Sequence, residues 1–577
     1  MWTLLLAAYA ATPAYTLSFP DRQAHSVLVE AQLPAKDGVA DLFMATWTPG
    51  SYLIREFARN VEGLEATGAN GESLPITKTR KNRWRVETGG NDTFTLRYKV
   101  YSRGLNVREN FVVHDFAMLN GAPTFIVPAD LQGPYDVTVQ RPAGWDVTVT
   151  QLSPDDSDTF TAPSYDLLVD SPILVGSPTL SSFVVDGVEH VLVDLPAVEP
   201  WNSGKAAAAL ERLVKEQKAF WGQFPYDRYL FLNLLAERGG GLEHLGSTMM
   251  MTSRFSTDED EAFQSWLGLA SHEQFHAWNV KRLRPAALGP FDYENEVYTE
   301  SLWIAEGFTS YYDDVLLARA GLIDEGVYLD RMGKNLETLE STPGRLVQPV
   351  SQASYDAWIK YYRGDENSVN TSISYYTKGA IVAWVTDAHI RKLTKNEKSL
   401  DDAMRLAYTR YSGEAGYTPE QFVAVLSEVA GADLAPFMAQ LVDTTEEVDV
   451  SEALEVFGLV RSPADPADRK AWLGVSVDGA NTVTSVWSAS PAWTAGLNVE
   501  DEILAVDGTR LTDLTSALKR YSPEDTVELL VARRGKVRTL SVTLGEKVGV
   551  PKLAVDGKAK KPVQKVRASW IGLREAK

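Results

Sequence analysis

The stretch His272-Glu273-Gln274-Phe275-His276 decides how the rest of this chain is interpreted. Two histidines four residues apart lie on one face of a helix, so both imidazoles can reach a single metal ion. Glu273 follows the first histidine and is placed to take a proton from a metal-bound water. Residues 266–270 lead in with apolar side chains at helical spacing, as expected of a buried helix. The pattern predicts a metallopeptidase site with His272 and His276 as ligands and Glu273 as general base.

A second segment, residues 300–312, is also predicted to be helical, and Glu306 stands at the centre of its apolar and aromatic surface. A lone carboxylate is costly to bury there, and coordination to a metal would offset that cost. Two histidines and one glutamate leave a fourth tetrahedral position for water. Glu306 is therefore the expected third ligand, and one Zn²⁺ is the expected ion. Glu300 is a weaker candidate, which either orients a ligand histidine or lies on a solvated helix face.

These residues resemble the glycyl aminopeptidase family of PDZ-containing zinc metallopeptidases, which are gluzincins related to the alanyl and leucyl aminopeptidases. The resemblance covers nearly the whole chain. Five pieces in order carry it, together with a PDZ-like C-terminal segment: residues 47–52 (WTPGSY) with 55–57 (REF), 240–244 (GGLEH), 272–285 (HEQFHAWNVKRLRP), 302–312 (LWIAEGFTSYY) and 375–379 (YYTKG). The resemblance implies the same roles for His272, His276, Glu306 and Glu273 as the motif does.

The glycine-rich piece resembles the segment that lies along the substrate cleft in related aminopeptidases. The resemblance implies that Gly240 and Gly241 bind substrate and that Glu243 holds its free α-amino group. Glycines let the backbone approach a substrate closely, and a carboxylate can pair with an ammonium group. His244 stands where many relatives in the wider clan have asparagine. Without the resemblance, residues 239–241 would be interpreted as a turn after a strand over 229–236.

Tyr376, in a Tyr-x-Lys-Gly pattern, resembles the tyrosine whose hydroxyl supports the oxyanion in related enzymes. A preorganised donor of this kind is worth a few kcal/mol in a transition state. Tyr375 is adjacent and similar. A purely structural role for both tyrosines in these aromatic surroundings stays open.

The expected fold class is a multidomain α+β protein. Residues 15–180 alternate short strand-like runs with turn residues, which predicts an N-terminal all-β domain. A helical region begins at residue 203, and the resemblance implies a thermolysin-like, mostly helical catalytic domain over 181–460. A Pro- and Asp-containing linker, residues 461–468, precedes a segment over 470–545 that resembles a bacterial-type PDZ domain.

In a PDZ domain a peptide adds as a β-strand, and amides near Leu473 and Gly474 can receive a C-terminal carboxylate. The alternative is a PDZ domain that only packs against the catalytic domain. Residues 546–577 carry nine Lys or Arg against three acidic residues. This composition predicts a basic, solvated C-terminal tail.

Composition narrows the class of protein further. The 577 residues, with 44% hydrophobic content and 15 Trp, are enough for several cores. The net charge of −21 argues against a nucleic-acid partner. The absence of cysteine excludes disulfides and a thiol nucleophile.

The N-terminal residues 1–11 resemble a signal peptide, with an apolar run and an A-x-A-like site at residues 8–10. They predict export to the periplasm or secretion. No later segment reaches the roughly 18 apolar residues needed to span a bilayer, so no membrane span is expected.

The expected activity is that of a zinc aminopeptidase acting on peptides with a free N-terminus, and the resemblance implies a preference for Gly or Ala. Two alternatives stay open. One is a zinc endopeptidase, because the metal site does not distinguish terminal from internal cleavage. The other is a non-catalytic peptide-binding protein that acts through its PDZ domain.

Overall fold

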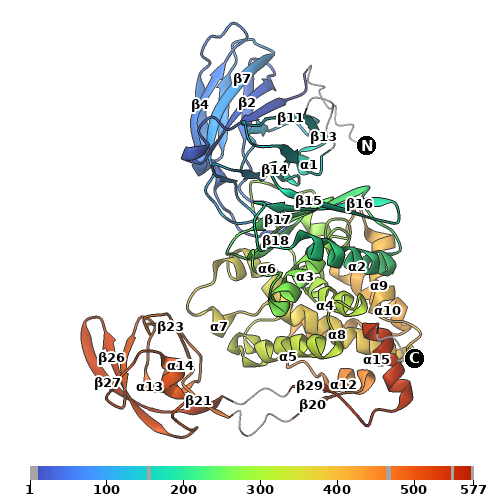
Figure 1. Ribbon diagram of the computed structural model, residues 1–577, viewed down its shortest axis with the longest axis vertical. Helices are drawn as coiled ribbons and strands as arrows, with labels where there is room; N and C mark the ends of the chain where they lie inside the picture. Colours follow the sequence, from blue (N-terminus) through green and yellow to red (C-terminus); the bar gives the residue numbers. More distant parts are fainter. Residues whose placement is uncertain (1–10, 153–157, 463–468, 548–551, 573–577) are drawn as a thin grey trace. The chain divides into compact units, whose positions relative to one another are not determined.

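The structure is a computed structural model that describes residues 11–152, 158–462, 469–547 and 552–572 (Figure 1). The expected signal peptide, residues 1–11, lies outside these ranges except for Ala11. The chain divides into two compact units, Met1–Val297 with Tyr411–Gly416 and Tyr298–Arg410 with Tyr417–Lys577. None of the helices in the described ranges combines the length and apolar character that crossing a membrane requires.

The first unit begins with the expected all-β domain, built from three sheets with strand orders β13-β11-β1-β2-β7-β4, β10-β3-β6-β5 and β12-β14-β9-β8. In β7 apolar residues alternate with polar ones, and the apolar ones are buried. The strands are β1 (Ala14–Ser18), β2 (Ser26–Pro34), β3 (Val39–Phe43), β4 (Val61–Thr67), β5 (Ile76–Arg80), β6 (Arg83–Glu87), β7 (Thr93–Tyr101), β8 (Phe111–Val112), β9 (Ala117–Leu119), β10 (Val127–Pro128), β11 (Tyr135–Gln140), β12 (Val147–Val149), β13 (Thr159–Ala162) and β14 (Ile173–Gly176). One short helix, α1 (Tyr165–Val169), precedes β14.

A five-stranded sheet follows in the same unit, with strand order β15-β16-β17-β19-β18. Its strands are β15 (Thr179–Val185), β16 (Val188–Leu195), β17 (Arg228–Leu235), β18 (Gly240–Glu243) and β19 (Ser247–Thr252). The three central strands run parallel and are apolar on both faces, whereas β18 is an antiparallel edge strand. The helices α2 (Ser203–Trp221) and α3 (Asp260–Phe275) accompany this sheet. The edge strand therefore carries the whole Gly-Gly-Leu-Glu piece.

The second unit is mostly helical (Figure 1). Its longer helices are α4 (Thr309–Arg319), α5 (Glu325–Ser341), α8 (Tyr375–Leu393), α9 (Leu400–Tyr411), α10 (Pro419–Ala430), α11 (Ala435–Asp443) and α12 (Ser451–Phe457). Shorter pieces are the π-helical η4 (Trp303–Phe308), η5 (Pro343–Leu346), α6 (Val350–Tyr355), η6 (Asp356–Trp358), η7 (Tyr361–Arg363) and α7 (Ser368–Thr371). Helix α8 begins at Tyr375, because the Ser374 side chain caps it by accepting from the Thr377 amide.

Two glycines let η4 and α8 pack backbone against backbone. A Cβ added to Gly307 would lie 2.4 Å from the α-carbon of Gly379, and one added to Gly379 would lie 2.7 Å from the α-carbon of Gly307. No larger residue fits at either position without moving a helix. The contact joins the helix that carries Glu306 to the helix that begins with Tyr375 and Tyr376.

The PDZ-like segment contains the sheets β25-β24-β26-β27, β22-β23 and β21-β28. Its elements are β21 (Lys470–Trp472), β22 (Val475–Val477), β23 (Val483–Val486), α13 (Pro491–Ala495), β24 (Glu502–Val506), β25 (Thr509–Arg510), α14 (Leu514–Leu518), β26 (Thr526–Arg533), β27 (Lys536–Thr543) and β28 (Gly545–Lys547). Helix α13 starts at a Ser490 cap and ends at Gly496, which has a φ of 78°. The segment has a hydrophobic core of its own.

The C-terminal region departs from the sequence-based expectation. Residues 553–555 form β29 (Leu553–Val555), which pairs antiparallel with β20 (Leu459–Arg461), and residues 561–571 form helix α15 (Lys561–Ile571). Trp570 is fully buried: its ring stacks on Phe457 with centroids 3.9 Å apart, and its Nε1 donates to the Tyr311 hydroxyl over 2.7 Å. The prediction of a solvated basic tail is therefore wrong for these residues. The many charged residues of this region predicted exposure to solvent, but Trp570 of α15 packs on the helical region.

Candidate metal centre

Helix α3 carries the two candidate histidine ligands at its C-terminal end. His272 lies in the last turn and His276 is the residue that caps it. Their ring centroids are 4.6 Å apart, with the planes at 87°. His276 is buried, and its Nδ1 lies 2.7 Å from the carbonyl oxygen of Asn279. A proton on Nδ1 is donated to this carbonyl, which directs the lone pair of the ring to Nε2, as in metal-binding histidines.

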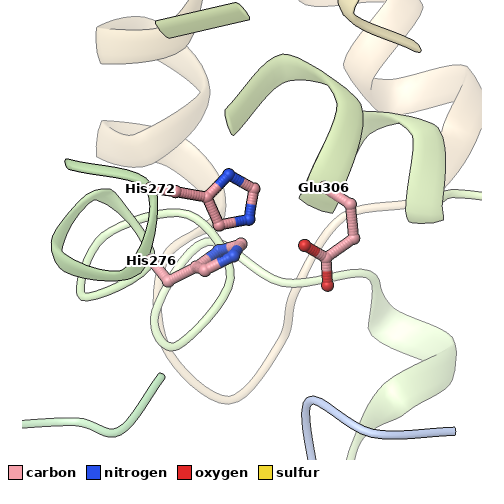
Figure 2. A group of neighbouring side chains, drawn as sticks. All are labelled: His272, His276 and Glu306. Atoms are coloured by element: carbon pink, nitrogen blue, oxygen red, sulfur yellow. The ribbon is translucent and has the colours of Figure 1, made fainter. Parts of the chain in front are cut away.

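Glu306 comes from η4, a π-helical turn whose six residues are all buried. One ligand atom from each of His272, His276 and Glu306 lies within 4.8 Å of the other two. Figure 2 shows the Glu306 carboxylate facing the two imidazoles. Two imidazoles and a carboxylate form a donor set that suits zinc, and a cation would stabilise a carboxylate buried among apolar residues. The residues therefore fit one divalent ion.

The edge strand β18 lies directly against Glu273, the residue after the first histidine. A Cβ added to Gly241 would be 2.0 Å from Oε1 of Glu273. Glu273 itself is buried, and Gly240, which precedes Gly241 on the strand, has a φ of 136° that favours glycine. Gly240 is thus required by its backbone conformation, and Gly241 is required because a side chain there would collide with the Glu273 carboxylate.

Glu243 ends the same strand and is only 4% exposed. One ligand atom from each of Glu243, Glu273 and His276 lies within 4.8 Å of the other two. The loop at residues 47–52 covers the Glu243 carboxylate: Gly50 has a φ of 84°, and a Cβ added there would be 2.5 Å from Oε1. The first unit therefore places two carboxylates and one imidazole together.

A cavity of about 80 Å³ opens beside Glu243. Its walls combine charged side chains, among them Asp170, Lys281 and Arg284, with aromatic ones. They include Trp47, Tyr52, Phe291 and Tyr293. The volume is enough for a few waters or a small chemical group, so the Glu243 carboxylate borders a space that a small group can occupy.

The two adjacent tyrosines differ in exposure. Tyr375 is fully buried, whereas Tyr376 is half-buried. Burial, and then the negative charge of Glu306, raise the pKa of Tyr376 well above its ordinary value. Its phenol is therefore protonated at neutral pH and able to donate a hydrogen bond. Of the pair, Tyr376 is the one with surface to offer a ligand.

Comparison with known families agrees with this geometry. Residues 265–382 match the M61 glycyl aminopeptidase family, residues 14–177 match the peptidase M61 N-terminal domain, and residues 471–544 match a PDZ domain. The chain thus resembles the M61 glycyl aminopeptidases in two of its domains. It is a metallopeptidase, as the sequence predicts.

One solved structure shares the fold over nearly the whole chain. The chain is similar to an aminopeptidase N family protein from Idiomarina loihiensis, with 29% identity and a TM-score of 0.91 over 97% of this chain and all of the other. An M1 zinc metallopeptidase from Deinococcus radiodurans has 16% identity and a TM-score of 0.46, covering 76% of this chain and 94% of that one. Yeast LTA4 hydrolase in complex with bestatin has 13% identity and a TM-score of 0.46, covering 77% of this chain and 70% of that one. A comparison with curated proteins finds no match.

Sequence reasoning missed one buried group of this metallopeptidase, Asp170. Its carboxylate lies 2.6 Å from Nζ of Lys281 and 3.2 Å from Nδ1 of His244, and it accepts from the Leu245 amide over 2.7 Å. Burial alone would raise the pKa of Asp170, but Lys281 and His244 outweigh it and bring the pKa to about 2. Asp170 is therefore ionised at neutral pH.

Asp170 also accounts for the histidine that follows Glu243. His244 and Lys281 both donate to Asp170, and Lys281 belongs to the piece at residues 272–285. The carboxylate thus ties the end of the Glu243 strand to the chain just beyond His276. The sequence did offer a signal for Asp170: His244 and Lys281 lie in the two pieces that form the site, and a basic side chain that is buried there needs an acidic partner.

Glu300, the weaker candidate, lies exposed at a bend before the helix, which begins at Leu302 rather than at Glu300. Its exposure agrees with a solvated side chain. The group that orients His276 is instead the carbonyl oxygen of the buried Asn279.

Proposed function

We propose that this metallopeptidase is a zinc-dependent aminopeptidase that removes the N-terminal residue of peptides. The observation that carries the proposal is the position of Glu243, which is 4% exposed and lies within 4.8 Å of ligand atoms of Glu273 and His276. A buried carboxylate next to the candidate general base is suited to bind a substrate ammonium group. An internal peptide bond has no such group, which disfavours the endopeptidase alternative.

In the proposed enzyme, His272, His276 and Glu306 hold the ion. When bound, zinc lowers the pKa of a coordinated water and polarises the scissile carbonyl. Glu273 takes the proton of the attacking water and delivers it to the nitrogen of the departing peptide. Asn279 keeps the His276 ring oriented through the Nδ1 contact. Apart from the half-buried His272, the groups in these roles are buried.

Two further groups act on the substrate. Glu243 pairs with the α-amino group and so sets where the first peptide bond lies, with Gly240 and Gly241 forming the strand beside it. The Tyr376 hydroxyl donates to the oxyanion of the tetrahedral intermediate. The proposal includes a preference for N-terminal Gly or Ala, which the family description of a glycyl aminopeptidase supports.

Hydrolysis of glycyl- and alanyl-anilides tests the proposal, run beside the same peptides with acetylated N-termini and with a chelator. We expect chelator-sensitive release from free-amine substrates alone. Glu273→Ala should abolish turnover with zinc content retained, and Glu243→Ala should raise KM sharply with zinc content unchanged. Glu300→Ala, which changes an exposed glutamate, is the matched control and should behave as wild type. Equal cleavage of acetylated peptides would establish an endopeptidase instead.

The proposal extends to location and to the PDZ domain. Export to the periplasm or outside the cell is proposed from residues 1–11, and N-terminal sequencing of protein recovered from each cell fraction would test it. A PDZ domain indicates peptide binding. A C-terminal peptide is the proposed ligand, and titration with free and amidated peptides would test whether the carboxylate is required.

A further inference from the structure

A strip of exposed apolar side chains lies beside the start of α8. It consists of Tyr298 (41% exposed), Tyr355 (45%), Ile359 (61%) and Tyr361 (44%), and we call it the apolar strip. Tyr298 stacks on Tyr355, with ring centroids 5.0 Å apart at 26°. Tyr355 ends α6, Ile359 follows η6 and Tyr361 begins η7, whereas Tyr298 precedes η4 in the chain. Large side chains that gather on a surface in this way mark a binding face.

Buried aromatic residues hold the strip in place from beneath. The Trp358 ring is 3% exposed and lies 6.5 Å from the ring of Tyr298. The ring of Tyr361 lies 4.8 Å from that of the fully buried Tyr375. A side chain fixed by a buried neighbour loses little conformational freedom when a ligand covers it. The exposed faces of the Tyr298 and Tyr361 rings are therefore already ordered before a ligand binds.

The strip is continuous with the catalytic groups of the second unit. The Tyr361 ring lies 5.5 Å from the ring of Tyr376, the proposed oxyanion donor. At its other end, the Ser354 hydroxyl accepts from the backbone amide of Trp303, the first residue of the helix that carries Glu306. The Tyr361 end of the strip thus lies next to the proposed oxyanion donor, and all four of its side chains are exposed.

We infer that the apolar strip binds the part of a peptide substrate that lies C-terminal to the cleaved bond, with a preference for apolar or aromatic side chains there. The inference rests on the proposed aminopeptidase function. A substrate held by its α-amino group has a single residue on the amine side of the bond. A surface that leads away from the oxyanion donor therefore has only the leaving peptide to accommodate.

The chemistry of the strip suits this occupant. Tyrosine rings offer broad apolar faces to side chains, and their hydroxyls can bond to peptide groups. Ile359 adds an aliphatic contact at the most exposed point of the strip. The four side chains of the strip carry no charge, and the intervening Lys360 pairs with Asp356 over 3.8 Å. Peptides should therefore be selected by apolar content and by length.

The experiment compares Ile359→Ser and Tyr355→Ser with wild type on two free-amine substrates, the pentapeptide Ala-Leu-Phe-Ala-Ala and alanyl-anilide. The anilide has no peptide beyond the cleaved bond. We expect kcat/KM on the pentapeptide to fall about tenfold, mainly through KM, as loss of a partly buried apolar contact implies. The value on the anilide should stay within about twofold of wild type, because neither substituted residue touches the proposed catalytic groups.

Val184→Ser is the matched control, since Val184 on β15 is 60% exposed and lies outside the strip. It should leave both substrates unaffected. Equal losses on the pentapeptide and the anilide, or no loss on either, would overturn the inference. A change in sedimentation mass without a change in peptide selectivity would identify a second copy of the chain as the occupant and would overturn it as well. Failure of the proposed function gives a different result, because wild type would then not release the anilide at all.

Discussion

The α-carbon of Gly50 lies directly against the carboxylate of Glu243. A Cβ added to Gly50 would be 2.5 Å from Oε1 and 2.6 Å from Oε2, and the φ of 84° already disfavours any other residue. Residue 50 belongs to the all-β domain, whereas Glu243 ends the edge strand of the five-stranded sheet. The glycine of the Trp-Thr-Pro-Gly-Ser-Tyr piece is therefore part of the site that we assign to the substrate amine.

Gly50→Ala should displace the Glu243 carboxylate and weaken binding of the substrate amine. We expect KM for free-amine substrates to rise about tenfold with little change in kcat, because an interaction common to ground and transition states is lost. Zinc content should not change. Steady-state kinetics with alanyl-anilide and metal analysis of the purified variant provide the measurement.

The control for this change is Gly63→Ala. Gly63 has a φ of 58° and nothing within 4 Å of an added Cβ, so it carries the backbone strain without the contact. A similar rise in KM for both variants would show that strain, rather than displacement of Glu243, causes the effect.

The contact between Gly307 and Gly379 predicts a large loss of stability when either is enlarged. An alanine at residue 379 would place its Cβ 2.7 Å from the α-carbon of Gly307, so the two helices must separate. We expect Gly379→Ala to lower the free energy of unfolding by about 3 kcal/mol. Urea denaturation followed by tryptophan fluorescence would measure it.

Gly333→Ala serves as the comparison, because Gly333 lies inside α5 and the nearest atom to an added Cβ is 3.9 Å away. Alanine there should raise stability by up to about 1 kcal/mol, since it favours the helix. If Gly379→Ala were equally benign, the two helices would not be in backbone contact.

Asp170 predicts a pH dependence of stability. Its pKa in the folded protein is about 2, below the ordinary value of 3.8. A lowered folded-state pKa contributes stability that is present above the unfolded pKa and is lost as the pH falls towards 2. For Asp170 the contribution is about 2 kcal/mol.

Asp170→Asn should remove that contribution and leave the Lys281 charge buried beside a neutral amide. We expect a loss of about 2–4 kcal/mol near pH 7 and a smaller difference from wild type near pH 3. Urea midpoints at the two pH values would measure it. Asp136→Asn is a suitable control, because Asp136 is more exposed and accepts a hydrogen bond from Thr161 rather than from a buried cation. A difference between Asp170→Asn and wild type that does not vary with pH would contradict the assignment.

The chemistry of this site could be predicted because its residues are close in sequence. His272 and His276 are one helical turn apart, and Glu306 stands out as the carboxylate of an otherwise apolar helix. The β domain could be predicted for a similar reason, since turn residues and strand alternation are local signals. The PDZ domain was predicted from the resemblance of residues 470–545 to a known domain.

What could not be predicted depends on pairs that are far apart in sequence. Gly307 and Gly379 each look like ordinary helix glycines until the helices are in contact. Asp170 is one of many acidic residues in this chain, and nothing near it in sequence indicates that Lys281 will be its partner. Composition misled in the C-terminal region, where a high density of lysine concealed the apolar contacts of α15.

The burial of Trp570 predicts that the C-terminal helix stabilises the helical region of the enzyme. Its ring stacks on Phe457 and donates to Tyr311, and its carbonyl oxygen accepts from Nε of Arg319 over 2.8 Å. Trp570→Ala should therefore lower the free energy of unfolding by about 3–5 kcal/mol. Trp493→Ala, at a tryptophan that is 54% exposed in the PDZ domain, should cost about 1 kcal/mol or less. Thermal unfolding of both variants decides the matter, because equal midpoints would mean that α15 adds nothing to the stability of the helical region.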